Sequence, residues 1–259
     1  MAAMAYMNVH WQSRTLDLAV SMNVVLPQRE NYADRTPYRT LFLLHGLSDD
    51  HTIWMRRTSI ERYAEERGIA VVMPAVERSF YADMRHGLAW ETFVREEVPA
   101  AARSFFPLSA RREDTWVAGL SMGGYGAFKL ALSAPKAFSA AGSFSGALDM
   151  ADDMETPRHR TNGRWQAEME NIFGGPAGFK DSPNDLFSLA KGLPETERRR
   201  LRLYQCCGTS DFLHGANLAF RDHALGLGLD LTYEEDPGEA HTWGYWDRKV
   251  QDFLRWLLG

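Results

Sequence analysis

Apolar side chains recur along the chain in two patterns that both predict β-strands. In residues 16–24 they fall at every second position, the period of a strand with one covered face. Residues 40–44 and 69–73 are continuous apolar runs, typical of strands covered on both faces. Similar runs predict further strands at 115–121, 138–144, 201–207 and 229–233.

Helical patterns separate these predicted strands. Residues 58–67 begin with Thr58 and Glu61, the spacing of a capping box, and residues 90–106 are interrupted or bent at Pro99. The remaining helices are predicted at 123–132, 215–226 and 242–258. Strands that alternate with helices at this spacing indicate the α/β class, with a mostly parallel, doubly wound sheet and helices on both faces.

One segment breaks the alternation. Residues 149–197 are rich in charge, glycine, proline and asparagine, with short helical patterns at 165–173 and 185–191. We interpret this segment as a helical cap inserted over the carboxyl ends of the strands, because residues 1–259 suffice for a single large α/β domain.

The predicted strand ending at Gly119 turns through Ser121 directly into a helix that starts at Gly123. A serine in such a turn adopts a strained backbone, and glycines at both sides let neighbouring backbone pass closely. The turn would present the Ser121 hydroxyl above the sheet, at the positive end of the following helix. We therefore predict that Ser121 is a nucleophile.

A serine nucleophile needs a base and a group that orients the base. Functional groups of a doubly wound sheet gather where its strands end, which selects Asp211 and His241. The chain order serine, aspartate, histidine is that of an α/β-hydrolase. Asp236 and Asp185 are the alternatives to Asp211. His241 would act as general base and acid, and Asp211 would hold its tautomer.

The oxyanion formed in acyl transfer needs backbone donors. The N–H of Met122, directly after the nucleophile, is one candidate, and the N–H of Leu47, after the 40–44 strand, is the other. We expect His45 to hold this loop in place. His45 with Asp49, Asp50 and His51 lacks the paired-histidine spacing of a zinc site, so no metal is expected.

Several side chains near predicted strand ends are candidates for the substrate pocket. Aromatic residues in these loops would line a cleft, although each also suits core packing: Trp54, Phe80, Tyr81, Trp243 and Tyr245. The segment 142–146 is a second glycine-flanked serine pattern, but it lies one residue out of register for a nucleophile turn. We expect its Ser145 to form part of the pocket wall.

Composition narrows the class of partner. The net charge of −5 gives no reason to expect a nucleic acid or an anionic membrane. No apolar run reaches the length of a membrane helix, and the first residues lack the pattern of a signal peptide. Cys206 and Cys207 are adjacent in a predicted strand, which suits buried thiols in a reducing compartment. We expect a soluble cytoplasmic protein with a small-molecule substrate, and a homo-oligomer is left open.

Taken together, the motifs resemble the esterase D family of α/β-hydrolases, and within it the bacterial tributyrin esterase branch. The resemblance runs from about residue 40 to the end of the chain. It rests on the segments 45–48, 119–126, 144–148, 207–213 and 241–243, together with Pro74.

This resemblance implies a carboxylesterase for short acyl chains, acetyl to butyryl, with a small acyl pocket and no cofactor. The same family contains S-formylglutathione hydrolases. Those related to human esterase D usually carry Ser-Gly-Leu-Thr-Cys where this chain has His-Gly-Leu-Ser-Asp at residues 45–49. Acetyl and feruloyl esterases of polysaccharides are also relatives, so an acylated sugar is a further candidate. Acyl transfer to an alcohol in place of water is also left open.

Overall fold

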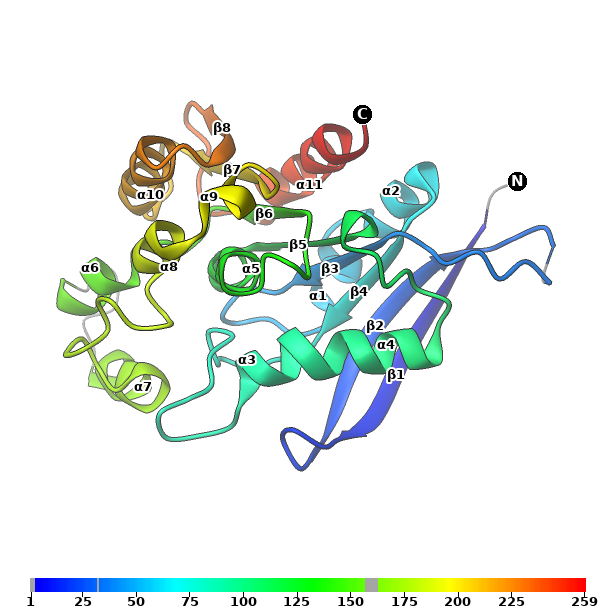
Figure 1. Cartoon of the computed structure of the whole chain (residues 1–259), viewed down its shortest axis with the longest axis horizontal. Coiled ribbons are helices and arrows are strands. Elements are labelled where there is room, and N and C mark those ends of the chain that lie inside the picture. The colour runs from blue at the N-terminus through cyan, green and yellow to red at the C-terminus, as the bar shows by residue number, and fades with distance from the viewer. Residues whose placement is uncertain (1–2, 32, 157–162) are drawn as a thin grey trace.

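The computed structural model describes residues 3–31, 33–156 and 163–259. Within them, eight strands form one sheet in the order β1-β2-β4-β3-β5-β6-β7-β8 (Figure 1). Their bounds are β1 Met4–Ser13, β2 Leu18–Pro27, β3 Thr40–Leu44, β4 Ala70–Pro74, β5 Thr115–Leu120, β6 Ala140–Phe144, β7 Arg202–Gly208 and β8 Asp230–Asp236. The six strands from β4 to β8 run parallel, whereas the β1–β2 hairpin joins β4 antiparallel. The predicted mostly parallel α/β sheet is confirmed.

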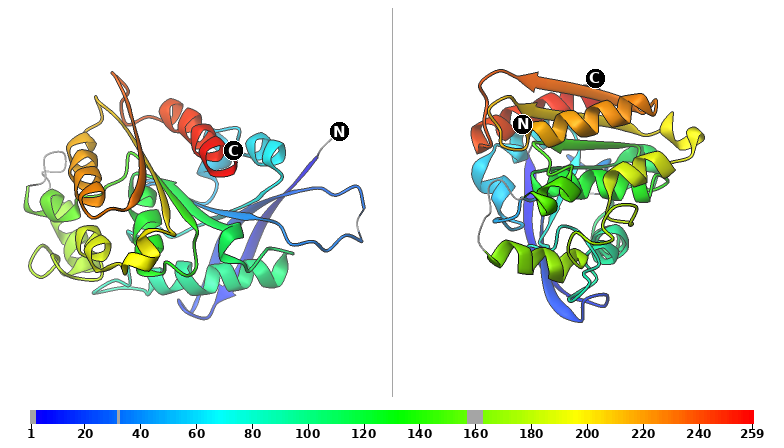
Figure 2. Two further views of the ribbon diagram at one scale, coloured as in Figure 1. Left: turned by 45° about the horizontal axis from the view of Figure 1, so that its top comes forward. Right: turned by 90° about the vertical axis from the view of Figure 1, so that its left-hand side faces the viewer.

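Helices cover both faces of this twisted sheet (Figure 2). One core contains side chains of α4 (Val98–Phe105), α5 (Met122–Ser133) and α10 (His214–Gly226). The opposite core contains those of α1 (Ile53–Arg57), α2 (Ile60–Arg67) and α11 (Trp243–Leu258). Every residue of β3, β4 and β5 is buried, which explains why their sequences are almost continuously apolar.

Two local features of the structure differ from the expectations. The predicted capping box is wrong: Ser59 is the N-cap of α2, and the Thr58 hydroxyl instead donates to the Trp54 carbonyl. Strand β1 was not predicted, although Met7, Val9 and Trp11 alternate with exposed residues. This alternation with a period of two residues was the sequence signal that could have predicted β1.

The helical stretch around Pro99 consists of three parts. These are α3 (Trp90–Thr92), a π-helical turn (Phe93–Glu97) and α4. Pro99 is the second residue of α4, which follows the π-turn without a break, so its ring nitrogen has no N–H to donate to the preceding turn. The expected interruption is therefore a π-turn that precedes the proline.

Between β6 and β7 the chain forms α6 (Met150–Glu155), α7 (Gly163–Phe173), α8 (Leu186–Gly192) and α9 (Glu195–Arg198). Figure 1 shows α6, α7 and α8 gathered at one side of the molecule. We call this segment the cap. Helices α7 and α8 were predicted and α6 was not; residues 157–162 of the predicted insertion lie outside the described residues. No described helix has the length and apolar character needed to cross a membrane.

Candidate active site

Ser121 occupies a sharp turn between β5 and α5. Its φ of 53° and ψ of −117° lie outside the regions that non-glycine residues usually adopt. The neighbouring glycines are required by close backbone: a Cβ on Gly119 would lie 2.5 Å from the carbonyl group of Gly123, and one on Gly123 would lie 2.5 Å from the Leu44 carbonyl oxygen. The sequence Gly-x-Ser-x-Gly thus folds into a tightly packed turn that holds the Ser121 hydroxyl at the end of the strand.

His241 and Asp211 complete a hydrogen-bonded chain with Ser121. The His241 Nε2 lies 3.1 Å from Ser121 Oγ, and its Nδ1 lies 2.8 Å from Asp211 Oδ2. The Asp211 side chain is fully buried, and its other oxygen accepts from the Leu213 N–H. The His241 ring packs between Phe212, at 4.5 Å between centroids, and Trp246, at 4.7 Å. This arrangement can remove the serine proton and hold the resulting imidazolium.

The two alternative aspartates have other partners. Asp236 accepts from the Tyr245 hydroxyl at 3.0 Å and forms an ion pair with Lys249 at 2.7 Å. Asp185 is the N-cap of α8 and accepts from the Phe187 N–H. Asp211 is the candidate that reaches His241.

The loop after β3 lies across from the Ser121 turn. A Cβ on Gly46 would lie 3.8 Å from the Ser121 Cβ, and Leu47, Ser121 and Met122 line one cavity. Met122 is the first residue of α5, where backbone N–H groups have no partner inside the helix. The N–H of Leu47 and of Met122 makes no hydrogen bond within the described residues, so both remain available to an oxyanion.

His45 is buried and holds this loop from inside. Its Nε2 accepts from the Val76 N–H at 3.1 Å, and its Nδ1 lies 2.8 Å from the Gly46 carbonyl oxygen. Burial lowers the pKa of His45 to about 4, because desolvation disfavours the imidazolium. A neutral ring with its proton on Nδ1 satisfies both contacts.

The cavity at Ser121 is small, with a volume of about 20 Å³. Its walls come from the Leu47 loop, the Phe80 loop, the cap and the segment after Asp211; they are Leu47, Phe80, Ser121, Met122, Ala147, Met150, Asp153, Trp165, Phe212 and Leu213. Phe212 and Leu213 follow a strand end, so the strand-end rule could have found them. Met150, Asp153 and Trp165 belong to the cap, and no sequence pattern indicated that they would approach Ser121.

Of the six residues that we expected to line the pocket, Phe80 lines this cavity and the other five do not. Trp54 and Tyr81 are buried in the core, where the Trp54 Nε1 donates to the Leu44 carbonyl and the Tyr81 hydroxyl donates to the His45 carbonyl. Ser145 is fully buried, and its Oγ accepts from the Trp246 Nε1 at 3.2 Å. Trp243 packs edge-on against Trp54 and Trp246. Tyr245 is fully buried as well, and its hydroxyl donates to Asp236. These five side chains are held by packing and hydrogen bonds to other elements instead of lining the cavity.

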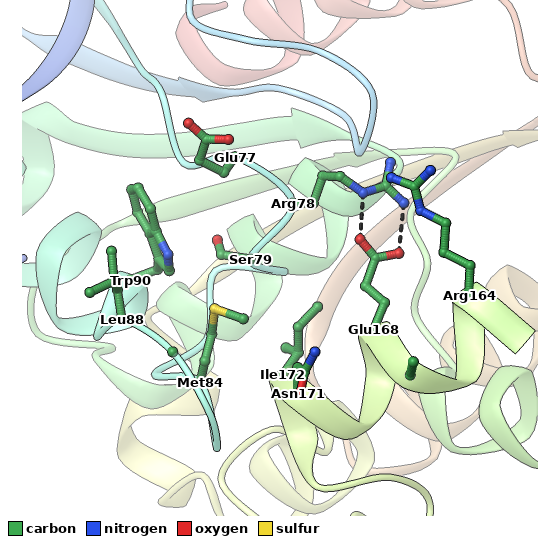
Figure 3. A pocket seen from close by; sticks show the side chains of 12 residues that line it. Glu77, Arg78, Ser79, Met84, Leu88, Trp90, Arg164, Glu168, Asn171 and Ile172 are labelled. Carbon is green, nitrogen blue, oxygen red and sulfur yellow. Dashed lines mark hydrogen bonds and ion pairs between the residues drawn. The ribbon is translucent and has the colours of Figure 1, made fainter.

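A larger cavity of about 490 Å³ lies beside the other face of α7 and does not include Ser121 (Figure 3). Its walls are mostly apolar, with Met84, Leu88, Trp90 and Ile172 among them, and Arg78 and Glu168 form an ion pair at its rim. Among the described residues, no group of three or more His, Cys, Asp or Glu side chains is placed to hold a metal ion.

Comparison with known proteins agrees with this geometry. The Esterase family model matches residues 13–257. The chain belongs to this esterase family. An acetyl esterase of Caldicellulosiruptor saccharolyticus is 29% identical, with 98% of each chain covered.

Two solved structures of Staphylococcus aureus proteins are similar to this esterase. The substrate-bound serine hydrolase FphF has a TM-score of 0.89 and 33% identity, with 99% of each chain covered. The S-formylglutathione hydrolase FrmB has a TM-score of 0.87 and 33% identity, covering 99% of this chain and 100% of that one. The protein is therefore a serine esterase with the α/β-hydrolase fold, a carboxylic ester hydrolase.

Proposed function

We propose that this serine esterase hydrolyses short-chain acyl esters, acetyl to butyryl, and that Ser121, His241 and Asp211 carry the reaction. The observation that supports the chain length is the cavity beside the Ser121 hydroxyl, which at about 20 Å³ holds roughly one small group. Phe80, Met150 and Trp165 bound it, and all three are buried. A long acyl chain would have to displace these side chains.

The proposed reaction proceeds through an acyl-enzyme. Ser121 Oγ attacks the ester carbonyl carbon while its proton passes to His241 Nε2, and the carbonyl oxygen becomes an oxyanion that the N–H groups of Leu47 and Met122 stabilise. The bond to the alcohol then breaks, and the alcohol leaves with the proton from His241. A water molecule repeats these steps on the acyl-Ser121 ester and releases the acid.

Chain-length preference is tested with p-nitrophenyl acetate, butyrate and octanoate. We expect kcat/KM to fall at least about tenfold from butyrate to octanoate, because the longer chain does not fit the small cavity. Met150→Ala widens the cavity and should raise the octanoate-to-acetate ratio about fivefold. Met154→Ala is the matched control, since Met154 is also buried in α6 but lines neither this cavity nor the 490 Å³ cavity. Equal rates on all three esters would contradict the proposed preference.

A thioesterase role on S-formylglutathione is the second candidate, supported by the similarity to FrmB. Against it stands Asp49, at the position where the S-formylglutathione hydrolases related to human esterase D usually carry cysteine. Turnover on S-formylglutathione should be compared with that on p-nitrophenyl acetate, tributyrin and an acetylated sugar. A preference for the thioester by orders of magnitude would replace the ester proposal.

We also propose a cytoplasmic location, a suggestion supported by the two cysteines. Cys206 and Cys207 are free and buried, and burial raises the pKa of both thiols. Neither is held in a disulfide, which suits a reducing compartment. Immunolocalisation or fractionation of the source cells would test the location.

A further inference from the structure

Four consecutive carbonyl groups each accept a hydrogen bond, that of Leu44 at the end of β3 and those of the next three residues. We call residues 44–47 the oxyanion loop. The donors are Trp54 Nε1 to Leu44 at 3.0 Å, Tyr81 Oη to His45 at 3.0 Å, the Asp49 N–H to Gly46 at 3.2 Å, and Arg78 Nη1 to Leu47 at 3.4 Å. The first two come from fully buried side chains, and the third closes a turn that begins in the loop. The fourth bond is the longest, and it acts on Leu47, whose N–H is the proposed oxyanion donor.

Arg78 differs from the other donors because it is also bound to the cap. Its Nη2 donates to Glu168 Oε2 at 2.7 Å, and its Nε donates to the other oxygen of the same carboxylate (Figure 3). This two-point contact fixes the plane of the guanidinium, which a single hydrogen bond would leave free to rotate. The third nitrogen, Nη1, is thereby aimed at the Leu47 carbonyl.

Glu168 lies on α7, one turn after Trp165, which forms a wall of the Ser121 cavity. The same cap helix therefore shapes the acyl cavity with one side chain and holds Arg78 with another. We propose that Arg78 is a positioning residue that couples α7 to the oxyanion donor of Leu47. This inference rests on the serine-esterase chemistry described above and adds a residue that does not touch substrate.

The expected loss of turnover on removal of Arg78 follows from its hydrogen bond to the Leu47 carbonyl. Loss of a whole oxyanion donor typically lowers turnover by about 10²–10³. Removal of Arg78 leaves the Leu47 N–H in place but frees its carbonyl, so we expect a smaller loss, about tenfold in kcat. KM should change little, and the loss should be the same for acetate and butyrate esters because the oxyanion is common to both.

Arg78→Gln and Glu168→Gln are the variants to measure, with Arg164→Gln as the matched control. Arg164 lies on α7 one turn before Glu168 and lines the same 490 Å³ cavity, but within the described residues it makes no ion pair with Glu168. Arg164→Gln removes one positive charge, as Arg78→Gln does. Thermal unfolding of each variant establishes that it is folded.

The decisive readout is the affinity for trifluoroacetone, a ketone to which Ser121 Oγ adds while its proton passes to His241 and the ketone oxygen becomes an oxyanion. We expect about tenfold weaker inhibition in Arg78→Gln and about threefold in Glu168→Gln, with wild-type inhibition in Arg164→Gln. The Arg78→Gln, Glu168→Gln double variant should resemble Arg78→Gln, because the pair acts as one unit.

Four outcomes would contradict either the coupling or the proposed function. Wild-type trifluoroacetone affinity in Arg78→Gln, or an equal loss in Arg164→Gln, would overturn the coupling. A change in KM alone would also overturn it, because that result makes Arg78 a substrate contact. Absence of ester hydrolysis in the wild-type protein would instead refute the proposed function.

Discussion

Ser121 and Ser145 end adjacent parallel strands in almost the same way, yet their hydroxyls serve different purposes. Both have a positive φ, 53° and 48°. The Ser121 N–H donates to the Phe144 carbonyl and the Ser145 N–H donates to the Cys206 carbonyl, so each serine extends its strand's hydrogen bonds by one residue. After Ser121 the chain enters α5 at once, and the hydroxyl lies beside His241 at the edge of a cavity. After Ser145 the chain continues as a loop, and the hydroxyl is buried.

The buried hydroxyl of Ser145 supports the other site indirectly. It accepts from the Trp246 Nε1, and Trp246 packs edge-on against the His241 ring. A left-handed serine between glycines is therefore not enough to make a nucleophile. What distinguishes the two turns is the histidine that reaches one of them and the helix N-terminus that follows it.

The sharpest test of this difference is removal of each hydroxyl. Ser121→Ala should lower kcat on p-nitrophenyl acetate by about 10⁴–10⁶, because the nucleophile is lost. Ser145→Ala should lower it by no more than about threefold, through a looser Trp246. A fluorophosphonate probe followed by peptide mass spectrometry should label Ser121 alone. Labelling at Ser145, or full activity in Ser121→Ala, would show that Ser121 is not the sole nucleophile of the two serines.

The glycines that flank the two turns should also differ in tolerance. A Cβ on Gly123 would meet the backbone oxygens of Leu44 and His45 at 2.5 and 2.7 Å, whereas one on Gly146 would meet side-chain atoms, chiefly the Ser143 hydroxyl at 2.2 Å. Because a hydroxyl can rotate and backbone cannot, Gly123→Ala should lower the free energy of unfolding by about 3 kcal/mol and Gly146→Ala by about 1 kcal/mol. Urea unfolding measures both. Equal losses would show that the two turns are equally constrained.

Acid should lower the stability of the protein through His45, which lies in the loop opposite the Ser121 turn. The pKa of His45 is about 4 in the folded protein, against an ordinary value of 6.5. Between these values the unfolded chain binds a proton that the folded one does not, so stability falls as pH falls from 6.5 toward 4. From pH 7 to pH 5 the loss from this group is about 2 kcal/mol.

His45→Gln removes this titration and keeps a side-chain acceptor for the Val76 N–H. Urea unfolding at pH 7 and pH 5 should therefore show a smaller acid-induced loss in the variant than in the wild type. An identical loss in both proteins would mean that His45 does not carry the pH dependence.

Much of the sheet was predictable, because burial on both faces leaves a direct mark on the sequence. The runs at 40–44 and 69–73 are β3 and most of β4, and all their side chains are covered. The edge strand β1 was missed because it is only half-covered and its pattern is weaker. The capping box at Thr58 was wrong because its hydroxyl is held by the carbonyl of Trp54.

The sequence alone determined where the chemistry is concentrated. The glycines around Ser121 force a sharp turn, and the strand-end rule selected Asp211 and His241, which the structure brings within hydrogen-bond distance of one another. These features depend on local backbone geometry and strand order, so they leave signals in short segments.

Only the tertiary structure decided which side chains surround that chemistry. Phe80, a pocket candidate from the sequence, shares one cavity with Met150 and Trp165, which no pattern indicated. Trp54 and Tyr81 were equally good candidates, but they donate to the carbonyls of the oxyanion loop instead. The physical reason is that a side chain's direction depends on how its element packs against others. A hydrogen bond between Arg78 and Glu168 joins positions 90 residues apart, and no local pattern encodes such a contact.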